Sequence, residues 1–250
     1  MTRFHAGLVA LFSSVALAQG ADASRPPPRQ AESGGQMSSV LSGKALGSGT
    51  LIHGQLGWPS LSATLLTSAG GPLDFGGRFS FLYGYEGITQ VAGIPGLKLQ
   101  GVLRFQLLER GKLNLGLRFS PGVFFYFFPG GTEIGMPLPV DLAFGFAVSP
   151  KLMLNLGLDL PAFLVFGPYG GLAVPLLAGG GLEYAVDRQL ALTLNLRAGP
   201  SVPLTGNSYS FMLWQGYWCF DALGRPYRCG AYYSLSAPAM EALFGLTYRL

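Results

Sequence analysis

The sequence predicts an all-β fold: a transmembrane, antiparallel, up-and-down β-barrel of about ten strands, with eight strands as the alternative. Three observations carry this prediction: apolar and polar residues alternate, the alternating stretches recur at a nearly constant spacing, and charge is scarce. Only 11% of the 250 residues are charged and 49% are apolar, whereas ordinary soluble domains carry about 25% charged residues. Strands with one apolar face each need an apolar solvent outside the barrel, and lipid is that solvent.

The alternation is clearest in the stretch KLNLGLRF at 112–119, where leucines and a phenylalanine occupy every second position. Successive side chains of a strand point to opposite faces, so these apolar residues share one face, whereas a helix would spread them around all sides. Similar stretches begin at Leu73, Leu113, Leu152 and Leu190, at spacings of 40, 39 and 38 residues. A solenoid or a propeller also repeats, but neither explains apolar residues that face outward on every strand.

The N-terminal part is expected to lie outside the barrel. Arg3 precedes an apolar stretch, and Ala16-Leu17-Ala18 provides small residues around a cleavage site, so residues 1–18 are predicted to be a signal peptide cleaved after Ala18. The alternative for this stretch is a buried helix of a soluble domain. Residues 19–48 are rich in Gly, Ser, Gln and Pro, and we expect a disordered periplasmic linker there. The barrel then covers 49–250.

Ten strands follow from the alternating segments and the turns between them. They are expected at 49–57, 60–68, 73–86, 97–109, 112–127, 138–149, 152–166, 174–186, 189–203 and 237–250. The alternative count is eight, if the first two segments are one long bent strand that lies partly outside the sheet. Bacterial barrels need an even number of strands, and the parity would then be awkward. Short polar turns join the strands at one end and longer loops, including 205–236, at the other. This asymmetry is typical of outer-membrane barrels.

Over residues 50–250 the chain resembles the bacterial outer-membrane β-barrel proteins, by pattern and not by a specific motif. Its last residues are similar to the C-terminal strand that the barrel-assembly machinery recognises in that family, with Phe244, Leu246, Tyr248 and Leu250 on one face. The resemblance implies a Gram-negative envelope, location in the outer membrane, and both chain termini in the periplasm. It also implies contact with outer-membrane lipid and lipopolysaccharide.

Alternation assigns each strand residue to the lipid face or to the lumen. The lipid face is expected to carry Phe75, Phe79, Phe81, Leu99, Leu103, Phe105, Leu142, Phe144 and the alternating leucines of the stretches that begin at Leu113, Leu152 and Leu190. The charged lumen-lining residues are Asp74, Arg78, Lys98, Arg104, Arg118, Asp141, Asp159, Glu183, Arg197, Glu241 and Arg249. Six are basic and five acidic, so we expect an ion-paired interior that does not select one sign of ion. These side chains either only hold the barrel together, line a pore or form a ligand site.

The long loop 205–236 is the most individual part of the chain. Its Cys219 and Cys229 are predicted to form a disulfide, because a near pair of cysteines in an exported chain usually does. Aromatic residues and arginines are the composition of binding hot spots, and the contact candidates are Trp214, Tyr217, Trp218, Arg225, Tyr227 and Arg228. The loop is either a lid over the barrel mouth or a contact surface for an unknown extracellular ligand.

No constellation of residues predicts catalysis. His53 is the single histidine after the predicted signal peptide, and nothing fixes its geometry to a nucleophile. We predict no catalytic residue, metal site or cofactor, and the dispersed basic residues predict no nucleic-acid partner. The predicted function is a non-enzymatic outer-membrane barrel with a structural or surface-interaction role. The alternatives are a narrow passive channel or small apolar-solute transporter gated by loop 205–236, and a lipid-modifying barrel enzyme that uses His53.

Overall fold

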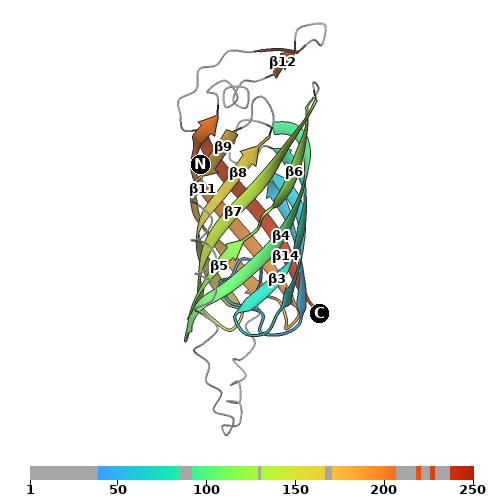
Figure 1. Ribbon diagram of the computed structural model, residues 1–250. Helices are drawn as coiled ribbons and strands as arrows, with labels where there is room; N and C mark the ends of the chain where they lie inside the picture. Colours follow the sequence, from blue (N-terminus) through green and yellow to red (C-terminus); the bar gives the residue numbers. More distant parts are fainter. Residues whose placement is uncertain are drawn as a thin grey trace, which may run out of the picture. The chain divides into compact units, whose positions relative to one another are not determined.

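The computed structural model describes residues 39–84, 92–128, 131–166, 171–206, 218–220, 226–228 and 237–250. These residues form an all-β fold, in which ten strand positions make a closed, antiparallel, up-and-down barrel (Figure 1). The predicted antiparallel, up-and-down barrel and the preferred count of ten strands are therefore confirmed. Among the described residues, no helix has the length and the apolar character that a membrane span requires.

Twelve segments build the ten strand positions of the wall. They are β1 (Thr50–Trp58), β2 (Ser60–Ser68), β3 (Leu73–Gly84), β4 (Ala92–Arg110), β5 (Leu113–Phe119), β6 (Gly122–Phe128), β7 (Gly131–Ala147), β8 (Leu152–Val165), β9 (Gly171–Pro175), β10 (Leu177–Ala185), β11 (Leu190–Gly206) and β14 (Ala237–Arg249). Pairing of β14 with β1, from Leu51↔Arg249 to Trp58↔Ala242, closes the barrel. The short strands β12 (Trp218–Phe220) and β13 (Pro226–Arg228) form a separate two-stranded ladder.

Two of the wall strands are interrupted where a proline removes a hydrogen-bond donor. β5 and β6 both lie between β4 and β7, and the break between them contains Pro121. β9 and β10 both lie between β8 and β11, and β9 ends at Pro175. Backbone bonds still cross the breaks, because Gly101 N–H donates to the Pro121 carbonyl at 2.8 Å and Leu176 N–H donates to the Pro200 carbonyl at 2.9 Å. Proline therefore interrupts the ladders without opening the wall.

Short turns join the strands at one end of the barrel, which we call the turn end; the opposite end is the loop end. The turn between β10 and β11 shows the local cause. The Asp187 carboxylate accepts hydrogen bonds from the N–H groups of Gln189 at 2.7 Å and Leu190 at 2.8 Å, and these bonds hold the pKa of Asp187 below its usual value. An aspartate that binds backbone two residues onward is a standard turn device.

β7 begins earlier than the sequence predicts. It starts at Gly131, seven residues before the strand expected at 138–149, and pairs with β6 through Phe128↔Gly131. Pro137 and Pro139 lie within it, and prolines ordinarily argue against the interior of a strand. The connection between β6 and β7 is correspondingly short.

The outer face of the wall is apolar on every strand position. Seven of the eight residues named for the lipid face, all except the half-buried Leu142, are 38–59% exposed, and Leu156 reaches 65%. Exposed apolar side chains of this size occur on all ten strand positions of the wall. A soluble monomer rarely exposes a contiguous apolar patch larger than a few hundred Å², so this face needs an apolar partner.

Candidate functional site

The charged residues predicted for the lumen lie on the inner face of the wall. Seven are at most 8% exposed: Asp74, Lys98, Arg104, Asp141, Asp159, Glu183 and Arg197. The remaining four are half-buried: Arg78, Arg118, Glu241 and Arg249. The eleven side chains divide into one group near the turn end and a second group around a cavity, with Arg118 belonging to both.

Residues 39–48, which we call the plug segment, enter the barrel at the turn end. Residues 39–46 are buried or half-buried in its interior, and Gly47 and Ser48 are exposed. The plug residues Val40 and Leu46 pack in one buried cluster with Leu51, Leu66 and Val102 of the wall. The expectation of a disordered linker is therefore wrong for residues 39–48, and residues 19–38 lie outside the described part of the chain. The physical reason is that apolar pairs, Val40-Leu41 and Ala45-Leu46, interrupt the Gly- and Ser-rich composition and meet apolar residues on the inner face.

Side chains of the wall accept hydrogen bonds from backbone N–H groups of the plug segment. The Asp74 carboxylate accepts from Leu46 N–H at 3.2 and 3.1 Å, and the Gln106 amide oxygen accepts from Ala45 N–H at 2.7 Å. Glu183 Oε2 accepts from Ser39 N–H at 3.3 Å. A buried backbone donor is costly without a partner, so these acceptors allow an irregular segment to stay inside the barrel.

Arginines of the wall donate to the carbonyl oxygens of the plug segment. Arg104 donates to the Ser39 carbonyl and to the Ser42 carbonyl at 3.4 Å. Arg118 donates to the Val40 carbonyl at 2.8 Å, and Arg249 donates to the Ser48 carbonyl at 2.8 Å. The wall and the plug segment therefore provide hydrogen-bond partners for each other's polar groups.

The backbone of the plug segment lies directly against the wall at Gly43. A Cβ added to Gly43 would overlap backbone atoms of Gly116 on β5 and Ala143 on β7. The reverse also holds, since a Cβ at Gly116 would overlap the backbone of Gly43. Only a pair of glycines lets the two backbones lie this close.

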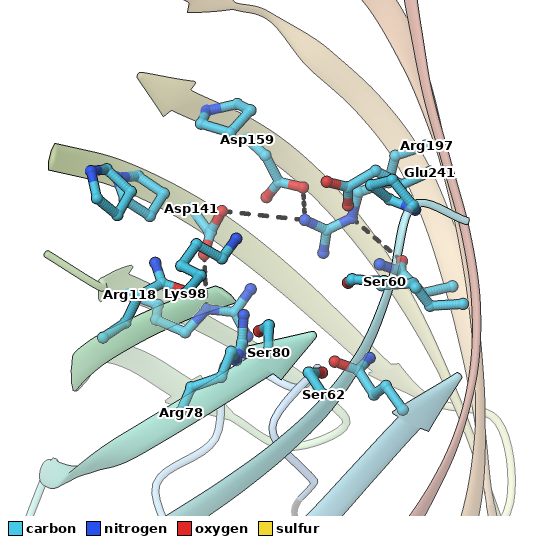
Figure 2. A pocket seen from close by; sticks show the side chains of 18 of the residues that line it. Ser60, Ser62, Arg78, Ser80, Lys98, Arg118, Asp141, Asp159, Arg197 and Glu241 are labelled. Carbon is cyan, nitrogen blue, oxygen red and sulfur yellow. Dashed lines mark hydrogen bonds and ion pairs between the residues drawn. The ribbon is translucent and has the colours of Figure 1, made fainter. Parts of the chain in front are cut away.

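A partly open cavity of about 70 Å³ lies beside the plug segment. Leu41 of the plug segment is part of its lining, and Pro59, at the tip of the β1–β2 hairpin, lines it as well. Figure 2 shows serines and charged side chains from several strands converging on this space. The labelled residues are Ser60, Ser62, Arg78, Ser80, Lys98, Arg118, Asp141, Asp159, Arg197 and Glu241.

Ion pairs connect the strands on one side of the cavity. Arg118 Nε lies 2.6 Å from Asp141 Oδ2, and the two residues are direct partners in the β5–β7 register. Arg197 is paired with Asp159 and lies 4.0 Å from Asp141 Oδ1. Glu241 is the register partner of Arg197 on β14. The arrangement ties β5, β7, β8, β11 and β14 together through charge.

His53 is fully buried within the wall and is bound to a neighbouring strand. Its Nδ1 lies 2.7 Å from Thr247 Oγ1, and in the β1–β2 register it is opposite Thr64. Ser60 and Ser62 line the cavity, whereas His53 is not among the lining residues. Within the described residues, the hydroxyl group bound to the His53 ring is that of Thr247. Among the described residues, no three His, Cys, Asp or Glu side chains gather into a metal site.

The loop candidates are only partly described. Trp218, Tyr227 and Arg228 belong to the β12–β13 ladder, and Trp214, Tyr217 and Arg225 lie outside the described residues. Cys219 is opposite Tyr227 in that ladder, two residues before Cys229. Because Cys229 lies outside the described residues, the disulfide stays a prediction, as does the signal peptide at 1–18.

The C-terminal strand carries the four predicted residues on its outer face. Phe244, Leu246, Tyr248 and Leu250 are 42–65% exposed, and β14 pairs with both β1 and β11. They are placed for contact with a solvent or partner outside the barrel, away from the lumen.

The sequence reasoning missed the plug segment, although the chain contains a signal for it. Leu51, Leu66 and Val102 occupy inward-facing positions and are at most 1% exposed. Apolar side chains on the inner face near the turn end indicate an apolar segment packed against them. Comparison with models of known protein families and with curated protein sequences gives no significant match.

Proposed function

We propose that the chain is a non-enzymatic outer-membrane β-barrel protein of a Gram-negative-type cell, with a structural or surface-interaction role. In this proposal the lumen is closed at the turn end by the chain's own plug segment. The single observation that carries the proposal is a closed barrel that is apolar outside and filled inside by residues 39–48.

The apolar outer face supports the membrane location. Outward side chains such as Phe79, at 51%, and Leu99, at 59%, would be covered by lipid instead of water. Transferring a large apolar side chain out of water stabilises a protein by about 1.5–3 kcal/mol, and the gain is repeated around the wall. In the outer membrane the plug segment and the chain end at Leu250 would lie on the periplasmic side, as the resemblance implies.

The occupied interior supports a role other than free conduction. A pore needs a continuous water path, whereas here a wall-to-plug network crosses the lumen near the turn end and buries Val40 and Leu46. A cavity of about 70 Å³ lies beside it. Such a barrel presents a scaffold and its loop end to the surroundings.

Cell fractionation and gel migration test the proposal. The full chain, produced in a Gram-negative host, should be recovered in the outer-membrane fraction and should migrate differently in gels before and after heating, as folded barrels do. Recovery as a soluble periplasmic protein would overturn the membrane location. A folded barrel with steady ion conductance would retain the location and overturn the closed lumen.

A narrow passive channel is the second candidate. The observation that favours it is that the described contacts of the plug segment with the wall are non-covalent, so a path would open if the segment withdrew. The cavity, with its charged lining, would then continue toward the turn end. A gating role for loop 205–236 remains part of this candidate.

A further inference from the structure

The charged residues of the cavity lining already have partners. Arg118 is bound to Asp141 at 2.6 Å, and Arg197 is paired with Asp159. The other charged residues of the lining also take part in interactions: Arg78, Lys98 and Glu241. A charged ligand would have to compete with these contacts, and breaking a buried ion pair is unfavourable. The lining therefore favours a neutral molecule.

The hydrogen-bonding groups that remain available in the lining are neutral. Ser60, Ser62 and Ser80 line the cavity and are at most 7% exposed, and their hydroxyl groups bind no other side chain among the described residues. Ser62 is the register partner of Gln55 on β1 and of Ser80 on β3. Residues directly opposite each other on neighbouring antiparallel strands have Cβ atoms about 4.5–5.5 Å apart. Hydroxyl and amide groups from three strands can therefore contact one small molecule.

Gln100 adds a buried acceptor to this side of the cavity. The residue lies on β4, lines the cavity and is 3% exposed. Its Nε2 donates to the Ser120 carbonyl at 2.6 Å, which fixes the orientation of the amide group. Its Oε1 is buried and accepts no hydrogen bond from the described residues. Because a buried acceptor without a donor is unfavourable, a ligand hydroxyl group at this oxygen would be stabilising.

The opposite side of the cavity presents carbon atoms between its ion pairs. Pro137 and Pro139 of β7 and Pro161 and Phe163 of β8 line it. In the ring of ten strand positions β2 and β8 are five steps apart, so this side faces the serines across the lumen. Figure 2 shows the space between Ser62 and Ser80 on one side and the strands that carry Asp141 and Asp159 on the other. Pockets for small molecules combine an apolar surface with a few polar groups that orient the ligand.

We propose that the cavity binds a small neutral polyol of the glycerol class. Its hydroxyl groups bind Ser62, Ser80 and Gln100, and its carbon atoms lie against Pro137 and Pro139. A hydroxyl group both donates and accepts, so it suits the serine hydroxyls and the Gln100 amide oxygen alike. This binding goes beyond the proposed function and does not depend on it, because the cavity belongs to the lumen of the plugged barrel wherever the barrel is located.

The cavity dimensions restrict the ligand. One water needs roughly 10–15 Å³, so a volume of about 70 Å³ accommodates about six non-hydrogen atoms, the size of glycerol. Leu41 of the plug segment limits the space on one side. A five-carbon polyol such as xylitol is too large to enter whole.

Saturation-transfer NMR on the full chain, refolded in deuterated neutral detergent micelles, tests the proposal. Glycerol and xylitol are titrated separately, each at low and at high sodium chloride concentration. We expect saturable transfer to glycerol, at least tenfold weaker binding of xylitol, and no effect of salt, because a neutral ligand is not screened. Absence of saturable transfer to glycerol would mean that the cavity holds water only and would overturn the proposal. Equal binding of xylitol would overturn the placement of the ligand in this cavity.

Variants locate the site. Ser62→Ala and Ser80→Ala should each weaken glycerol binding about threefold, and Gln100→Leu about tenfold, because each removes one hydrogen bond to the ligand. Ser62→Leu should abolish binding by filling the cavity. Thr132→Ala removes an exposed hydroxyl group on β7 and is the matched control, with unchanged affinity expected. Heat-dependent gel migration confirms that each variant is folded. Folded Ser62→Leu and Gln100→Leu proteins that bind glycerol as tightly as the parent would rule the site out.

Discussion

Arg104 Nη2 lies 2.7 Å from Asp74 Oδ2, and both side chains also bind the backbone of the plug segment. The two residues are direct register partners on β4 and β3, and they are 1% and 0% exposed. A buried ion pair is stable only when its remaining donors and acceptors find partners, and the plug segment provides them. The pair and the plug segment are therefore one unit, so that a change in either should affect the other.

Asp74→Asn should destabilise the barrel and loosen the plug segment. The change leaves Arg104 buried without its counter-charge, a loss of about 3–5 kcal/mol for a broken buried pair. Urea unfolding of the protein in micelles measures the free energy, and limited proteolysis measures the exposure of residues 39–48. The control is Glu109→Gln, which removes the partly exposed pair with Lys44 and should cost less than about 1 kcal/mol. Equal effects of the two changes would contradict the special role of the buried pair.

Gly43→Val should drive the plug segment out of the lumen and expose the Asp74–Arg104 pair to water, while the backbone ladders that close the wall remain. A side chain at this position overlaps the backbone of Gly116 and Ala143, and two wall strands cannot move apart without losing ladder bonds. Protease cleavage within 39–48 should increase, and conductance steps should appear in planar bilayers. Gly54→Ala is the control, because a Cβ there meets nothing within 4 Å. Unchanged protection of the segment in the Gly43→Val protein would show that it is not packed as described.

Leu156→Arg tests whether lipid covers the outer face. Leu156 is 65% exposed, so in water an arginine would be tolerated there, whereas at the midplane of a bilayer it should cost about 2–4 kcal/mol. Unfolding in lipid vesicles measures the difference. Lys112→Arg, at the exposed turn, is the matched control. A Leu156→Arg protein as stable as the parent in vesicles would argue against a membrane-embedded wall.

The wall could be predicted from the sequence because apolar and polar side chains alternate along each strand, and this pattern assigns every residue to one of the two faces. The row from Leu152 to Leu160 is enough to assign a strand and its faces, and the charged residues of the lumen follow from the same count. Ion-pair partners could not be predicted, because they depend on register. Arg118 meets Asp141 only through the exact alignment of β5 with β7, which turn geometry sets.

Amino-acid composition led to a wrong prediction in two segments, the first part of β7 and the plug segment. The first part of β7 was not predicted, because it contains Pro137 and Pro139. Each proline lacks a backbone hydrogen-bond donor, but this loss does not prevent a long strand in a closed wall. The plug segment was not predicted, because its glycines and serines are typical of a linker. Composition describes a segment by itself and contains no information on the surface against which the segment packs. Inside a barrel, Asp74 and Arg104 supply the hydrogen bonds that water would otherwise supply.

The most direct test of the central claim is conductance in a planar bilayer, measured on the full barrel with residues 39–48 present and on a variant that lacks them. Insertion of both proteins is first confirmed by heat-dependent gel migration. A closed lumen predicts a silent parent protein and discrete conductance steps after the deletion. Reproducible steps from the parent protein would contradict a plugged barrel.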